Sequence, residues 1–201
     1  MSAADGGATS EPREVAIADE GYGVEVLQSD VVFDGVVWDI RREQFAYHDG
    51  TLTREFMEHP GAVAVLAIDD RDRVLCIQQY RHPIQMRNWE LPAGLLDIEG
   101  EAPLAAAQRE LAEEADLIAS EWMPHITLHT SPGGSDEVIH VFRATGLAAA
   151  AEVFPRDAEE ADIVLQWVPL ADAVDAALAG RVHNGILLTA LLAEHARRTK
   201  G

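Results

Sequence analysis

The sequence is poor in cysteine. Cys76 is the only cysteine among 201 residues, so no intrachain disulfide can form. Because Cys76 lies in the apolar run at residues 74–77, we expect a buried structural thiol rather than a catalytic one. A chain without disulfides is typical of a reducing compartment, and we therefore expect a cytoplasmic protein.

Basic residues are also scarce. The chain has 15 Lys and Arg against 35 Asp and Glu, which gives a formal net charge of −20 at pH 7. Binding to nucleic acid or to an anionic membrane depends on clustered Lys and Arg, and no apolar stretch is long enough to span a membrane. We expect neither partner, and a phosphate-bearing substrate would have to arrive with metal. The acidic surface has a second interpretation, since Asp and Glu also improve solubility.

The remaining composition is that of a globular protein, with 48% hydrophobic residues. This content supports one domain with a small appendage. Residues 1–20 are small, polar and acidic, which indicates a disordered tail. Polar and apolar residues interleave through 21–58, where we expect a small antiparallel sheet with a hairpin turn at 48–51. Residues 59–201 then form the main domain.

Short strands and helices mix along the main domain. Residues 62–68 and 73–80 flank an acidic turn and are expected to pair as a hairpin. Further strands are expected at 126–130, 138–144 and 163–168, and helices at 170–179 and 184–198. With a helix between strands, the pattern predicts an α/β fold, an α/β/α sandwich of helices around a mixed sheet.

The most informative segment, residues 90–117, places a glycine loop before an acidic helix. Pro103 suits the first helical turn. At helical spacing, an apolar stripe is expected to face the core, and a group of carboxylates to lie beside it: Leu104, Ala107, Leu111 and Ala115 in the stripe, and Glu110, Glu113 and Glu114 in the group. Carboxylates this close repel one another, so they need positive charge from Arg109 and from a hard divalent cation. A solvated acidic face is the alternative.

This segment resembles the Nudix box, G-x5-E-x7-R-E-U-x-E-E-x-G-U, where U is aliphatic. The matching residues are Gly94, Glu101, Arg109, Glu110, Leu111, Glu113, Glu114 and Leu117. The sequence departs from the box twice. Six residues rather than five separate Gly94 from Glu101, and Asp116 replaces the glycine at the helix end. That position often needs a positive φ, which Asp tolerates better than most residues.

Three further segments, 78–83, 89–94 and 130–137, resemble the ADP-ribose pyrophosphatase branch of the family, especially its actinobacterial members. The resemblance implies a Nudix-type sandwich that hydrolyses the pyrophosphate bond of ADP-ribose to AMP and ribose 5-phosphate, with Mg²⁺ or Mn²⁺ as cofactor. It also implies a homodimer formed through the N-terminal sheet. Two alternatives remain: hydrolysis of another nucleoside diphosphate sugar or a dinucleotide, and a non-catalytic sensor that binds a nucleotide.

The resemblance also implies which residues do the chemistry. The metal shell would be Glu110, Glu113, Glu114 and the backbone carbonyl of Ala93. Pyrophosphate hydrolysis further needs a positioned water and a base. Glu137 matches the loop glutamate that serves as general base in the branch, with an ordinary turn residue as the alternative. Glu113 and Arg109 are expected to act beside it in catalysis.

Each residue that is expected to contact the substrate also has an alternative interpretation. Arg81 would pair with a phosphate or form a surface ion pair. Trp89 would stack on the base or pack beneath the sheet, and Glu90 would bind the adenine amino group or lie at a strand edge. Gly133 and Gly134 would let their loop bend toward the acidic helix. A later acidic run, Glu159, Glu160 and Asp162, is either a solvated charge run or a group near the metals.

Overall fold

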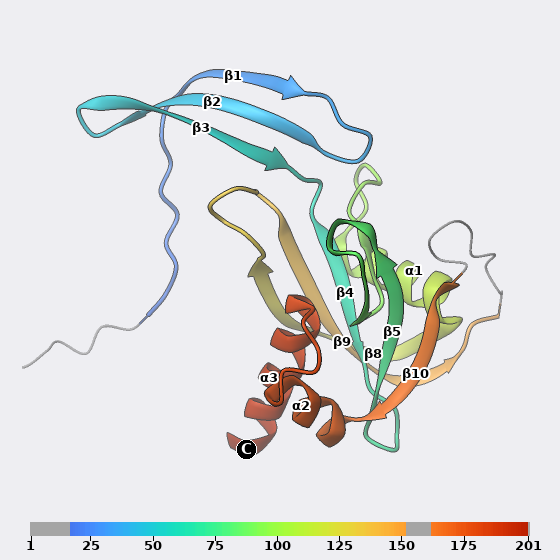
Figure 1. The fold of residues 1–201 in the computed structure, drawn as a ribbon. Helices are drawn as coiled ribbons and strands as arrows, with labels where there is room; N and C mark the ends of the chain where they lie inside the picture. Colours follow the sequence, from blue (N-terminus) through green and yellow to red (C-terminus); the bar gives the residue numbers. More distant parts are fainter. Residues whose placement is uncertain (1–16, 152–161, 201) are drawn as a thin grey trace, which may run out of the picture.

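The N-terminal strands form a sheet of their own. The structure is a computed structural model that describes residues 17–151 and 162–200. Within it, β1 (Val26–Phe33), β2 (Asp39–Tyr47) and β3 (Gly50–Glu58) pair antiparallel in the order β1-β2-β3, above the rest of the chain in Figure 1. The predicted hairpin is confirmed, with Tyr47 opposite Gly50. Most of the predicted tail, residues 1–16, lies outside the described residues.

The main domain contains two further sheets. One sheet has the order β7-β4-β9-β8 and is mixed, because β4 and β9 are parallel while the other pairs are antiparallel. Its strands are β4 (Ala62–Ala67), β7 (Ala93–Leu95), β8 (Leu117–His129) and β9 (Val138–Ala149). The other sheet is antiparallel and consists of β10 (Val164–Pro169), β5 (Arg73–Arg81) and β6 (Met86–Glu90), in that order.

The helices lie where the sequence predicts them. They are α1 (Pro103–Ala115), α2 (Leu170–Leu178) and α3 (Gly185–Lys200), with a short 3₁₀ turn η1 (His82–Ile84) after β5. Pro103 occupies the first turn of α1, as expected. Among residues 17–151 and 162–200, no helix is both long and apolar enough to cross a membrane.

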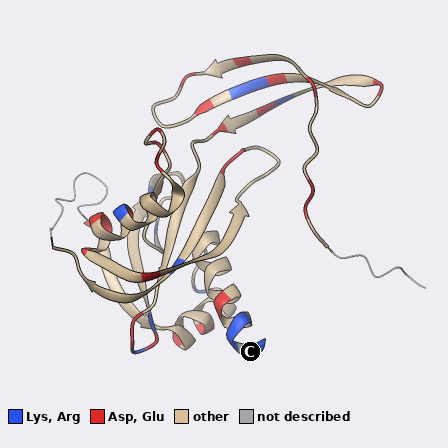
Figure 2. Cartoon of the chain, turned by 180° about the vertical axis from the view of Figure 1, so that it is seen from behind, with Lys and Arg blue, Asp and Glu red and all other residues tan. Residues whose placement is uncertain are grey.

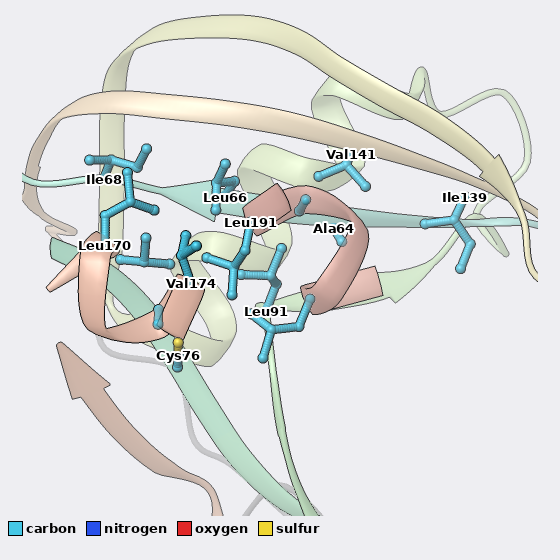
Figure 3. Close-up of a cluster of buried hydrophobic side chains, with 14 of the residues drawn as sticks. Ala64, Leu66, Ile68, Cys76, Leu91, Ile139, Val141, Leu170, Val174 and Leu191 are labelled. Carbon is cyan, nitrogen blue, oxygen red and sulfur yellow. The ribbon is translucent and has the colours of Figure 1, made fainter. Parts of the chain in front are cut away.

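Strand β4 separates two hydrophobic clusters. Its residues Ala62, Ala64 and Leu66 point to a cluster that includes residues of α2 and α3 (Figure 3). The alternate residues, such as Val63 and Val65, point to the other cluster, which includes residues of α1. Because both faces of β4 are covered by helices, the predicted α/β/α sandwich is confirmed.

Cys76 lies in the cluster below α2 and α3, as Figure 3 shows. It is 4% exposed and is a free thiol. Burial raises the pKa of the Cys76 thiol to about 12, so the reactive thiolate is not formed near neutral pH. The predicted structural role of this residue is confirmed.

The predicted pairing of residues 62–68 with 73–80 is wrong. The turn itself resembles that of a hairpin, because Asp69 N donates to Arg73 O at 3.0 Å and Ile68 bridges Val74. Beyond that bridge the strands separate, and β4 and β5 belong to different sheets. The reason is that β7 and β9 occupy the two edges of β4, which leaves no edge for β5.

The predicted apolar stripe of α1 is also wrong at its first member. Leu104 is 39% exposed, whereas Ala106 is fully buried. At about 100° per residue, the buried face of the helix is centred between Glu110 and Leu111 rather than on Leu104. Both Glu110 and Glu114 therefore fall inside the buried face, not beside it.

Asp116 caps the C-terminal end of helix α1, and its φ of 54° is in the left-handed region. Its backbone N–H donates to Ala112 O at 3.0 Å and closes the last turn. The expectation that this position needs a positive φ is confirmed, and Asp adopts it in place of the glycine of the box.

The burial of α1 predicts a contrast between two leucines of the same helix. Leu111→Ala removes a fully buried side chain and is expected to lower the free energy of unfolding by about 2–5 kcal/mol. Leu104→Ala, its matched control on the exposed side, is expected to change it by less than about 1 kcal/mol. Urea denaturation followed by circular dichroism measures both. Equal losses would contradict the placement of the helix.

Candidate active site

Two buried carboxylates of α1 lie against strand β7. Glu114 is 4% exposed, and its Oε2 accepts a hydrogen bond from Ala93 N at 2.8 Å. Glu110 is 8% exposed, and a Cβ atom at Gly94 would lie 2.0 Å from its carboxyl carbon. Only glycine permits this close approach, which explains why the residue after Ala93 lacks a side chain.

Arg109 holds the carboxylates on the other side. Its Nη1 donates to Glu110 Oε1 at 2.6 Å and to Glu113 Oε2 at 3.0 Å, while Nη2 donates to Glu101 Oε2 at 3.0 Å. The hydrogen bonds that Arg109 donates to Glu101 are the main reason that the pKa of Arg109 is raised, and they also lower the pKa of Glu101. One guanidinium group therefore holds more than one carboxylate at once and supplies positive charge beside them.

The donor chemistry of this corner fits a hard divalent cation. Carboxylate and backbone carbonyl oxygens are the ligands that such ions prefer, and Glu110, Glu114 and the residue Ala93 meet here. Glu113 is farther out, with a side chain 36% exposed. Over the described ranges, no three His, Cys, Asp or Glu side chains stand together as a metal cluster, and Arg109 and Ala93 N contact the carboxylates of this corner. A cation would therefore replace some of these contacts.

A cavity of about 530 Å³ adjoins the acidic corner. Ala93 lies in its wall, so the residue that bonds Glu114 also faces the cavity. Its other walls come from η1, β6, the residues before β2 and the start of α3. A space of this size suits a small organic ligand rather than a lone ion.

Arg81 and Glu90 both line this cavity, as their predicted roles require. They are already paired: Arg81 Nε donates to Glu90 Oε1 at 3.1 Å, and Nη2 donates to Oε2 at 2.8 Å. Glu90 is 4% exposed and also accepts from Gln79 Nε2 at 3.4 Å. The ion-pair alternative for Arg81 is therefore present, but its partner is buried in the cavity wall, and the Arg81 side chain itself is 42% exposed.

Trp89 lies on the opposite face of β6 from Glu90. It packs against the hydrophobic cluster beneath α2 and α3. It also lines a separate apolar cavity of about 210 Å³, together with Cys76. Successive residues of a strand point to opposite faces, so Trp89 and Glu90 cannot line the same cavity from β6. The packing alternative is the one that the structure shows for Trp89.

The loop with Gly133 and Gly134 bends toward β3, and not toward α1 as predicted. Met57 N donates to Gly134 O at 2.9 Å, and His59 N donates to Asp136 Oδ1 at 2.8 Å. The two glycines line another cavity, of about 540 Å³, beside residues 54–56 of β3. The loop follows β3 because the unpaired backbone groups at the end of that strand take it as a partner.

Glu137 is not an ordinary exposed turn residue. Its side chain is 17% exposed, its Oε2 accepts from Thr130 Oγ1, and its Oε1 lies 3.5 Å from His59 Nε2. His59 stacks on Trp38 with ring centroids 5.5 Å apart, and Trp38 lines the cavity that contains Arg81. A chain of contacts thus joins Glu137 to that cavity.

Trp38, His59 and Asn184 are the site residues that sequence reasoning missed. Asn184 lies in the cavity wall and caps α3, where its Oδ1 accepts from Leu187 N at 2.9 Å. The sequence did contain a signal for Trp38 and His59. If the predicted hairpin is extended away from its turn, Asp39 pairs with Glu58, and the next residues outward, Trp38 and His59, come close together. Of the late acidic run, Glu159 and Glu160 lie outside the described residues.

Figure 2 shows the overall distribution of charge, with acidic residues on most elements and several basic ones near the C-terminal end of α3. The last turn of α3 contains Arg197, Arg198 and Lys200. Arg198 Nε donates to the buried Glu194 at 2.8 Å, and its Nη1 to Asp72 at 2.6 Å. Arg198 therefore joins α3 to the turn between β4 and β5.

Comparison with known proteins agrees with this geometry. The sequence profile of the family described as "NUDIX domain" matches residues 57–189. The chain is 44% identical over 181 residues to an ADP-ribose pyrophosphatase of Mycobacterium tuberculosis (strain ATCC 25618 / H37Rv), covering 89% of this chain and 86% of the relative. It is 36% identical over 151 residues to an ADP-ribose pyrophosphatase of Bacillus subtilis (strain 168), covering 75% and 80%.

A solved structure described as an ADP compounds hydrolase shares the fold. It superposes with a TM-score of 0.74 at 19% sequence identity and covers 92% of this chain and 99% of its own. The profile match over more than half of the sequence, and two relatives above 30% identity, agree with the acidic helix and glycine loop described above. The chain therefore belongs to the Nudix family.

Proposed function

We propose that this protein hydrolyses the pyrophosphate bond of ADP-ribose to AMP and ribose 5-phosphate, with Mg²⁺ or Mn²⁺ as cofactor. The observation that carries the proposal is the position of Ala93, which bonds the acidic helix through Glu114 and also lines the cavity with Arg81 and Glu90. A cation site and an organic ligand site therefore share one strand. The relatives named as ADP-ribose pyrophosphatases support the choice of substrate.

Glu110, Glu114 and the carbonyl of Ala93 would hold the cation, with Glu113 as a further ligand. A bound divalent cation supplies positive charge to the phosphate oxygens and lowers the pKa of bound water. Arg109 places a positive charge beside the carboxylates and orients them through its hydrogen bonds to Glu110 and Glu113. The closeness of these carboxylates is thus a functional arrangement rather than a solvated acidic face.

On the substrate side, Arg81 would exchange part of its pairing with Glu90 for a phosphate oxygen, since its fork of donors suits both. Glu90 would then accept a hydrogen bond from the adenine amino group. Gly133 and Gly134 would shape the loop that ends at Glu137. The carboxylate of Glu137 would take a proton from the attacking water as a P–O bond forms and the bridging P–O bond breaks.

The partners and the compartment follow from charge and cysteine content. A net charge of −20 opposes binding to nucleic acid and to anionic membranes, so we propose a small nucleoside diphosphate as the ligand. The free, buried Cys76 is compatible with the reducing cytoplasm, where we place the reaction.

A substrate panel tests the specificity. With Mg²⁺ or Mn²⁺ present, ADP-ribose is expected to have the highest kcat/KM among ADP-ribose, GDP-mannose and NADH, with AMP and ribose 5-phosphate as products by chromatography. Chelation of the metal is expected to abolish turnover. A higher kcat/KM for either other compound would transfer the function to that substrate class. Tight ADP-ribose binding by calorimetry without turnover would favour a sensor.

Glu114→Gln tests the acidic helix. The variant keeps the shape of the side chain but removes its charge, so kcat for ADP-ribose is expected to fall by more than about 10²-fold, since metal-assisted charge stabilisation contributes several kcal/mol. Binding of ADP-ribose, measured by calorimetry, is expected to persist. Glu121→Gln is the matched control, because Glu121 is exposed and lies on β8. Full activity of Glu114→Gln would exclude Glu114 from the metal shell.

We propose that the N-terminal sheet forms a homodimer. Strand β1 is an edge strand whose apolar residues are exposed, with Val31 at 45% and Phe33 at 63%. Light scattering is expected to give a dimer for the native chain and a monomer for Phe33→Glu. Ile118→Glu is the control, because Ile118 is also exposed, at 50%, but lies on β8. A monomeric native chain would overturn the proposal.

A further inference from the structure

The side chain of His59 is buried, and His59 lies outside the Nudix box. It follows β3 in the connection to β4, and its side chain is 4% exposed beside Glu137. We propose that His59, together with Thr130, is a positioning residue that holds the carboxylate of Glu137 in its reactive orientation. This inference rests on the proposed role of Glu137 as the general base.

The hydrogen bonds of His59 define which nitrogen carries the proton. Gly61 N donates to His59 Nδ1 at 3.0 Å, so Nδ1 must act as an acceptor. In a neutral imidazole the other nitrogen, Nε2, then bears the hydrogen. Nε2 is the atom that lies 3.5 Å from Glu137 Oε1. The ring therefore presents a donor to the carboxylate in its neutral form.

The ring cannot easily turn away from Glu137. Trp38 stacks on one side of it, with an interplanar angle of 29°. The backbone N–H of His59 donates to Asp136 Oδ1 at 2.8 Å. This hydrogen bond joins His59 to the loop that ends at Glu137. Backbone bonds between Met57 and residues 134 and 136 hold the same two segments together. The direction of Nε2 is thus set by its surroundings on several sides.

Both oxygens of Glu137 have a donor side chain beside them. Thr130 Oγ1 donates to Oε2, and His59 Nε2 faces Oε1. The Glu137 backbone N–H donates to Ser135 Oγ at 3.1 Å, which fixes the chain at the same point. Two donor side chains, one beside each oxygen, define the plane of the carboxylate. A general base requires a defined orientation before it can accept a proton from water.

The separation of 3.5 Å between Nε2 and Oε1 is longer than that of a strong hydrogen bond. His59 therefore orients the carboxylate and leaves the lone pairs of Oε1 available to receive the proton. A purely structural role, in which His59 only ties the connection to the loop, would use its backbone N–H and Nδ1 and would not depend on a donor at Nε2. This difference can be tested.

The test is a pair of variants of the 201-residue chain, assayed with ADP-ribose and the divalent metal. His59→Phe keeps a ring for stacking on Trp38 but has no donor, whereas His59→Gln keeps an N–H donor without the ring. We expect His59→Phe to lower kcat by about 10–100-fold with KM changed less than twofold. His59→Gln is expected to restore most of kcat.

Two outcomes would overturn the proposal. One is a His59→Phe variant with native kcat, and the other is an equal loss of kcat in His59→Phe and His59→Gln. Thr130→Val, which removes the donor at Oε2, is expected to lower kcat with KM nearly unchanged, and it serves if His59→Phe does not fold by circular dichroism. A native kcat in Thr130→Val would then overturn the proposal.

Glu137→Gln separates this inference from the proposed function. If the native chain does not hydrolyse ADP-ribose, the proposed function fails. If Glu137→Gln retains native kcat, Glu137 is not the base and the inference fails with it. If Glu137→Gln loses turnover while His59→Phe does not, the base remains and only the positioning role fails. In the double variant Glu137→Gln/His59→Phe, we expect kcat to be no lower than in Glu137→Gln alone, because His59 acts only through the Glu137 carboxylate.

Discussion

The structure depends on two carboxylates that are buried in the inner face of α1. Glu110 and Glu114 would repel each other and lose hydration there, at a cost of several kcal/mol per charge without partners. Arg109 and the N–H of Ala93 offset that cost. The helix, the glycine loop and β7 therefore hold one another in place. The same arrangement concentrates oxygen ligands at one corner, so what stabilises the fold also prepares the chemistry.

Strand β7 connects the two halves of the site. Its short segment, Ala93–Leu95, pairs with β4 on the sheet side, bonds Glu114 on the helix side and opens on the cavity with Arg81 and Glu90. Because β4 is buried on both faces, β7 has little freedom to move. A rigid strand between a charged corner and an organic ligand cavity is well suited to position a pyrophosphate between them.

The N-terminal sheet is tied to the main domain through the loop that carries Glu137. Backbone hydrogen bonds join Met57 to the loop, and His59 lies between Trp38 and Glu137. Trp38 precedes β2, yet it lines the main cavity. The N-terminal sheet therefore contacts both the loop of Glu137 and the wall of the cavity.

The sequence alone determined the helices, the N-terminal hairpin, the α/β class and the acidic corner, because periodicity, turn residues and box spacing are local properties. Asp116 was correctly expected at a position with positive φ. Only the tertiary structure decided which strands share a sheet, why Leu104 is exposed while Glu110 is buried, and that the loop of Gly134 turns toward β3. It also decided that Trp89 packs inside and that His59 meets Glu137. These are contacts between distant segments, set by competition for strand edges and buried volume, which no local pattern encodes.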